Sequence, residues 1–107
     1  MAKIISKDEF LKMPANTVYR ECGPCWFDKL SIKGVSWDNG YWFQELCKMD
    51  ADDTQGMVSM FRSGSVKFDL DYEDGYGFSD DDENKQYLVY GNDDLNQLIN
   101  RLKECII

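Results

Sequence analysis

The sequence predicts one α+β domain built on a mainly antiparallel sheet of five to six strands with three helices. Short segments of alternating polar and apolar residues recur at hairpin spacing, and three other segments carry helix caps or helical periodicity. The chain has 107 residues, of which 43% are hydrophobic, enough for a single packed core. We therefore expect one domain over residues 1–107, in the order β-α-β-β-β-α-β-β-α, with helices on one side of the sheet.

The first half of the chain alternates between short strands and turn residues. A strand at 3–5 leads into Ser6-Lys-Asp-Glu9, a capping box that predicts a short helix ending before Pro14. Alternation or apolar spacing then predicts three strands in a meander, with Gly23-Pro24, Gly34 and Asp38-Asn39-Gly40 as the breaks. These strands are expected at 17–22, 27–33 and 41–49.

The second half predicts two helices and two strands. A helix at 55–62 closes at Gly64, a strand follows at 65–73, and a Gly- and Asp-rich loop covers 74–83. A strand at 86–90 leads to the last helix, with Asn92 as its cap. Apolar residues form one stripe along that helix, and we expect two of them, Leu98 and Leu102, to be buried. The stripe consists of Leu95, Leu98, Ile99, Leu102 and Ile106.

Charge is distributed unevenly along the chain. The net charge is −8: residues 1–48 carry seven basic and six acidic residues, whereas residues 49–107 carry five and fourteen. Such a surface repels nucleic acids and anionic membranes and attracts basic proteins. The chain has no histidine, the usual general base and commonest metal ligand. We therefore expect a binding protein rather than an enzyme, with no cofactor and no catalytic residues.

The sequence also predicts a cytoplasmic location. No segment approaches the ~18 apolar residues of a membrane span, and the N-terminus lacks the layout of a signal peptide. The four cysteines are then expected to be reduced thiols.

Cys22-Gly-Pro-Cys25 is identical to the redox motif of thioredoxins, which this chain resembles over those four residues. That chemistry needs the first thiol at the N-terminus of a helix, where its pKa is lowered. Here both flanking segments have strand character, so we interpret the motif as a Gly-Pro turn and the match as coincidental. A thiol-disulfide oxidoreductase using Cys22 and Cys25 remains a second alternative. A zinc site would need Cys47 and Cys105, which are far apart in sequence, so no metal site is expected.

Residues 69–83 hold eight acidic residues and no basic one. A calcium loop would place its glycine one position earlier, so two interpretations remain: a solubilising surface, or a nucleic-acid-like charge surface that fits a basic groove. The second interpretation makes these acidic residues candidates for partner binding. They are Asp69, Asp71, Glu73, Asp74, Asp80, Asp81, Asp82 and Glu83.

Six aromatic residues fall within positions 26–43. If 41–43 is a strand, Trp42 points away from Tyr41 and Phe43. We expect a loop to cover the outward-facing set; the alternative is an exposed interaction patch, which makes Trp42 a further candidate for partner binding.

Three segments together resemble a group of small acidic proteins from phages and prophages. They are Lys3-Ile-Ile-Ser-Lys-Asp-Glu-Phe-Leu-Lys-Met-Pro14, Thr17-Val-Tyr-Arg-Glu21, and Tyr87-Leu-Val-Tyr90 with the Leu-Asn-Gln-Leu-Ile-Asn-Arg-Leu-Lys run that ends at Lys103. The resemblance implies an accessory protein in a bacterial cytoplasm, in the style of anti-CRISPR proteins and DNA mimics.

Our leading hypothesis is a non-enzymatic inhibitor that binds a basic, nucleic-acid-handling host protein through its acidic face. The first alternative is a small-molecule or nucleotide sponge with a pocket lined by the aromatic residues.

Overall fold

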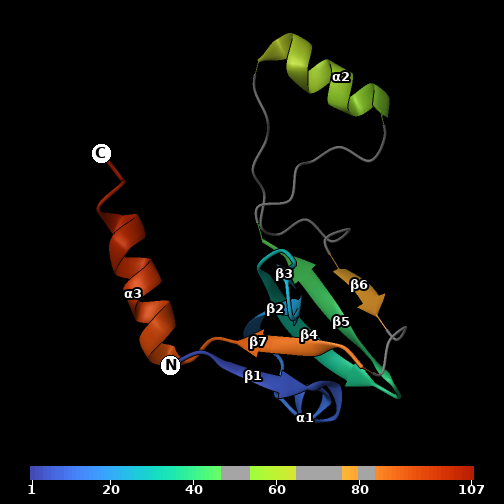
Figure 1. The fold of residues 1–107 in the computed structure, drawn as a ribbon. Helices are drawn as coiled ribbons and strands as arrows, with labels where there is room; N and C mark the ends of the chain where they lie inside the picture. The colour runs from blue at the N-terminus through green and yellow to red at the C-terminus, as the bar shows by residue number, and fades with distance from the viewer. Residues whose placement is uncertain (47–53, 65–75, 80–83) are drawn as a thin grey trace.

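The computed structural model describes residues 1–46, 54–64, 76–79 and 84–107, with the side chains of 76–79 left aside. Figure 1 shows a twisted sheet with α1 packed beside β1, while α2 and α3 lie away from the sheet. The strand expected at 65–73 and all eight acidic candidates of 69–83 lie outside the described residues.

The predicted α+β class, the largely antiparallel sheet and the element order are confirmed. All described strand pairs are antiparallel, in the spatial order β1-β7-β2-β4-β5-β6, with a two-residue strand, β3, beside β2. The elements are β1 (Lys3–Ser6), α1 (Lys7–Leu11), β2 (Thr17–Gly23), β3 (Trp26–Phe27), β4 (Ser31–Trp37), β5 (Gly40–Glu45), α2 (Thr54–Ser63), β6 (Tyr76–Ser79), β7 (Gln86–Val89) and α3 (Asn92–Lys103).

Three expected boundaries were wrong. The strand expected at 27–33 is interrupted at residues 28–30, which separate β3 from β4. Gly34 does not end a strand: β4 runs through it to Trp37, with a register shift between Lys33 and Ser36. A Cβ on Gly34 would lie 3.0 Å from the Cβ of Trp42. The glycine therefore allows β4 and β5 to approach closely, and it does not mark a turn of the chain. The segment expected to be a loop over 74–83 contains β6, because pairing with β5 overrides its turn-like composition.

The first helix is short and well anchored. Ser6 caps α1, and its side chain accepts a hydrogen bond from the backbone N–H of Glu9, as the capping box predicts. The helix delivers Phe10, fully buried, onto one face of the sheet. The Phe10 ring stacks on Tyr87 at 4.0 Å between centroids and meets Tyr19 at 4.6 Å and Tyr41 at 4.9 Å. This aromatic cluster is the centre of the core.

Lys33 is a charged residue at the edge of this core. Its Nζ lies 5.7 Å from the centre of the Phe10 ring and donates hydrogen bonds to the backbone oxygens of Met13 and Gly34. Burial lowers the pKa of this ammonium group. The two carbonyl groups and the ring satisfy a charge that would otherwise be too costly to bury.

The last helix forms as predicted, but the expectation that Leu98 and Leu102 are buried was wrong. Its N-cap is Gly91 rather than Asn92, and the Asp94 carboxylate accepts from the Gly91 N–H at 2.9 Å. No residue of α3 is buried; Leu98 is 42% exposed and Leu102 is 54% exposed. The helical period identified the face that can be buried, but period alone does not supply a surface to bury it against. The expectation that the helices pack on one side of the sheet therefore fails for α3, and it fails for α2 as well, which lies apart from the sheet (Figure 1).

Candidate functional site

The sheet has two faces of opposite character. Side chains alternate along a strand, so Tyr19 in β2, Tyr41 in β5 and Tyr87 in β7 share the face that Phe10 covers. The residues between them point to the other side, which we call the open face. Its members, aligned by strand pairing, include Ile4, Leu88, Arg20, Val18, Ile32 and Trp42. None of these six is buried.

Tryptophans concentrate at one end of the open face. Trp42 points away from the buried Tyr41, as the alternation predicts, and is 42% exposed. Trp37 pairs with Gly40 on the neighbouring strand, two residues before Trp42, so both indoles lie on the same face; Trp37 is 65% exposed. Our expectation that a loop covers this outward set was wrong. Large exposed aromatic side chains that share a sheet face are typical of protein-binding surfaces.

The Cys-Gly-Pro-Cys motif occupies a hairpin between β2 and β3, as expected. Cys22 pairs with Phe27 across the hairpin and is buried, whereas Cys25 is exposed in the turn. Burial raises the pKa of the Cys22 thiol. A redox-active first cysteine needs a lowered pKa and access to its substrate, so this geometry is unlike that of the thioredoxin site.

Within the described part of the chain, no group of three or more cysteine or acidic residues is arranged to hold a metal ion. Of the four cysteines considered for zinc, Cys47 lies outside the described residues, and Cys105 is exposed just past the end of α3. No helix in the described ranges is long and apolar enough to cross a membrane.

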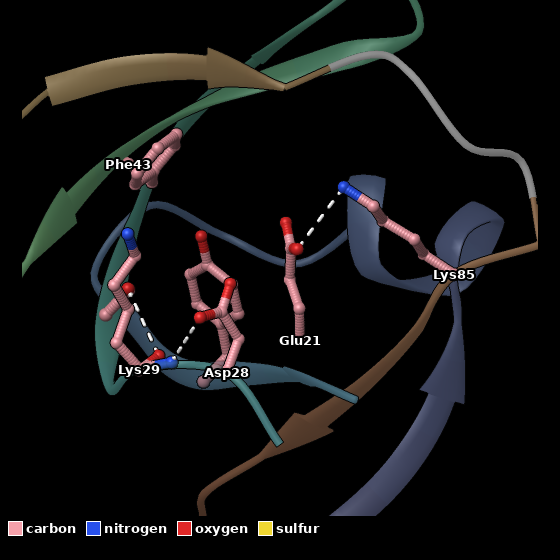
Figure 2. Close-up of a pocket in the computed structure, with 7 residues that line it drawn as sticks. Glu21, Asp28, Lys29, Phe43 and Lys85 are labelled. Atoms are coloured by element: carbon pink, nitrogen blue, oxygen red, sulfur yellow. Dashed lines mark hydrogen bonds and ion pairs between the residues drawn. The ribbon is translucent and has the colours of Figure 1, made fainter. Parts of the chain in front are cut away.

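The structure also reveals a polar pocket that the sequence did not predict (Figure 2). It is a hollow of about 200 Å³ beside the aromatic core, on the face of the sheet that carries Tyr19. Strand residues form its floor, and residues from the loops before β4 and β7 form its walls. The lining residues are Tyr19, Glu21, Asp28, Lys29, Ser31, Phe43 and Lys85.

Ion pairs dominate this pocket. Lys85 Nζ lies 3.2 Å from Glu21 Oε2, with both side chains largely buried, and Tyr41 donates its hydroxyl hydrogen to Glu21 Oε1. Lys29 Nζ lies 2.7 Å from Glu45 Oε1, and this carboxylate raises the pKa of Lys29. Burial, with a smaller contribution from Glu21, raises the pKa of the Tyr19 phenol, which therefore stays protonated. Each lysine is thus already neutralised by a carboxylate of the same chain.

This network ties loops to the core rather than presenting reactive groups. A nucleotide phosphate would have to displace Glu21 or Glu45 to reach either lysine, and it would also meet Asp28. The pocket escaped prediction because its partners lie far apart in sequence and no local pattern connects Lys85 with Glu21. Of the two rings that line it, Phe43 belongs to the aromatic set of positions 26–43 on which the sponge alternative depends, whereas Tyr19 does not.

Comparison with known proteins adds no relative to this picture. No protein-family model, no curated protein and no solved structure matches the chain.

Proposed function

We propose that this chain is a non-enzymatic inhibitor or modulator that binds a basic, nucleic-acid-handling protein of a bacterial host. The observation that carries the proposal is the exposed aromatic surface of the open face, where Trp37 and Trp42 lie together on one side of the sheet. The net charge of −8 supports a basic partner, because acidic residues attract such a protein from a distance.

The two features act at different stages of binding. Acidic residues raise the association rate by steering the partner, an effect that salt screens over a Debye length of ~10 Å at 0.1 M. Aromatic side chains desolvated in the final contact slow dissociation, because they bury a large apolar area at small entropic cost. We assign the first role to the acidic residues of 69–83 and the second role to Trp42 on the open face.

The geometry favours this function over both alternatives. The polar pocket has its cationic groups paired internally, which disfavours an anionic small molecule. The Cys22 thiol is buried with a raised pKa, which disfavours thiol-disulfide exchange. The exposed tryptophans share one face of the sheet, an arrangement typical of a protein-binding surface.

The proposal is tested by capture of a partner from bacterial lysate, with and without nuclease, followed by binding kinetics on the purified complex. Neutralising Asp69, Asp71 and Glu73 together should lower the association rate ~10-fold at low salt and leave dissociation almost unchanged. The triple variant Asp80→Asn, Asp81→Asn, Asp82→Asn should likewise lower the association rate and leave dissociation almost unchanged. Trp42→Ala should speed dissociation ~30-fold or more, by the ~2 kcal/mol of a binding hot spot.

A matched control removes the same charge elsewhere. Asp8, Asp28 and Asp38 are exposed and scattered, and their joint replacement by asparagine changes the net charge equally. Asparagine also tolerates the positive φ of 55° at Asp38. If this control slows association as much as the two clustered variants, only overall charge matters. If, in addition, Trp42→Ala leaves dissociation unchanged, the proposed surface is wrong.

A further inference from the structure

The apolar stripe of α3 is the largest unexplained feature of the described chain. Leu98, Ile99 and Leu102 lie on one side of the helix and are 42%, 47% and 54% exposed, and Ile106, just past the end of the helix, is 77% exposed. A lone helix of twelve residues is marginally stable in water, and packing normally stabilises it through its apolar face. The stripe therefore needs a covering surface.

The chain's own sheet is a poor candidate for that surface. Only Tyr90 and Gly91 separate β7 from α3, and the helix start is held by the Asp94 cap and by the N-terminal amine of Met1, which pairs with Asp93. The first turns do lie beside the open face, but a hollow of about 300 Å³ separates Leu95 and Leu98 from Arg20 and Leu30. Figure 1 shows the rest of α3 leading away from the sheet. Closure onto the sheet would have to move the helix relative to Met1, whose amine pairs with Asp93.

We infer that α3 pairs with α3 of a second copy of this chain, antiparallel, about a two-fold axis near Leu98 and Ile99. The spacing of the stripe fits this arrangement. Leu95 and Leu102 are seven residues apart and therefore lie on the same side of the helix. A two-fold axis between positions 98 and 99 sets Leu95 of one copy opposite Leu102 of the other. The same operation sets Leu98 opposite Ile99, which makes the stripe complementary to itself.

Charge specifies the antiparallel orientation. The first turn of α3 carries Asp93 and Asp94, and the last turn carries Arg101 and Lys103. Asp94 and Arg101 are seven residues apart and flank the stripe on the same side, where antiparallel helices bring like flanks together. The acidic first turn of each copy then faces the basic last turn of the other, a contact that occurs twice per dimer. Arg101 lies 3.2 Å from Glu104 of its own helix, and because its side chain is 69% exposed it can exchange this partner for Asp94 of the second copy. A parallel pair would place acid against acid and base against base.

The expected dimer is weak. One pair of short helices covers less than the ~1,200 Å² of a standard specific interface, so we expect weak association, with a dissociation constant of ~1–100 µM. This association goes beyond the proposed function, because it uses α3 and not the tryptophans or the acidic segment. The two proposals are therefore independent, and a result against one does not count against the other.

The test is sedimentation equilibrium of the full chain between ~1 and ~500 µM, a range that spans the expected dissociation constant. The average mass should rise from 12.5 kDa toward twice that value. Leu98→Glu should weaken dimerisation at least ~100-fold, since it sets two charges against the apolar seam. Phe61→Glu is the matched control: Phe61 is 81% exposed on α2 and should leave the dimer intact.

A second pair of variants tests the orientation without touching the apolar stripe. Arg101→Glu should weaken the dimer ~3- to 30-fold, whereas Arg62→Glu, the same change on α2, should have no effect. Circular dichroism verifies that each variant is folded. A wild-type chain that stays monomeric to ~500 µM overturns the inference. So does a dimer that survives Leu98→Glu, or one that Phe61→Glu disrupts equally. A dimer that Arg101→Glu leaves unchanged overturns the antiparallel orientation.

Discussion

Helices α1 and α3 present apolar residues in a similar way but end in opposite surroundings. The five-residue α1 places Phe10 among Tyr19, Tyr41 and Tyr87, where its exposure is 0%. The twelve-residue α3 has the longer apolar stripe and not one buried residue. The difference lies in connection, because α1 is held between β1 and β2 over the sheet, whereas α3 leaves β7 at its end and, among the described residues, only its first turns lie beside the sheet. Helical amphipathicity thus shows which residues of a helix can be buried. The chain topology decides whether another element covers them.

The largest expected effect is a difference between the two helices in the unfolding free energy that is lost when an apolar residue is truncated. Phe10→Ala should cost about 3–5 kcal/mol of unfolding free energy, because it leaves a cavity among three packed rings. Leu98→Ala should cost under ~1 kcal/mol, since alanine favours the helix and little packing is lost. Chemical denaturation at ~0.1 µM protein, where the proposed dimer is largely dissociated, measures both. Equal costs would mean that α3 packs in the free chain as α1 does.

A smaller expected effect, the loss of stability at alkaline pH, tests whether Tyr19 is buried on the covered face of the sheet. The raised pKa of Tyr19 means that the folded chain holds this proton more tightly than the unfolded chain does. Its contribution is therefore fully present below the ordinary tyrosine pKa of ~10 and is lost as the pH rises further. Between pH 8 and pH 11 the wild type should lose about 1.4 kcal/mol more stability than Tyr19→Phe.

Denaturation curves at the two pH values supply this comparison. The lowered pKa of Lys33 acts in the opposite direction, but it is common to both proteins and cancels in the difference. Identical alkaline losses in wild type and Tyr19→Phe would show that the Tyr19 hydroxyl is not in a buried environment.

Local signals in the sequence predicted much of this fold. The capping box at Ser6, the turn at Asp38-Asn39-Gly40 and the alternation around Trp42 are decided by residues within a few positions of one another. The strand order and register were not predictable, since β1 pairs with β7 across more than eighty residues and no local pattern encodes that choice. Gly34 was misjudged for the same reason, because its role depends on Trp42 of the neighbouring strand.

The candidate site was predictable only in part. Alternation correctly placed Trp42 on the opposite face from Tyr41, but which face would be covered depended on where α1 packs. The ion-pair pocket needed Lys85 beside Glu21, a contact made by the pairing of β2 with β7. The role of the acidic segment stays a prediction, since those residues lie outside the described part of the chain.

The most direct test of the central claim, that one sheet face is core and the other is a contact surface, is acrylamide quenching of tryptophan fluorescence. All three tryptophans are exposed, and none belongs to the aromatic core. The free chain should be quenched almost as strongly as the unfolded chain, and the captured complex should be quenched clearly less. Weak quenching of the free chain would mean that the open face is already covered. Equal quenching of the free chain and the complex would mean that the partner binds elsewhere.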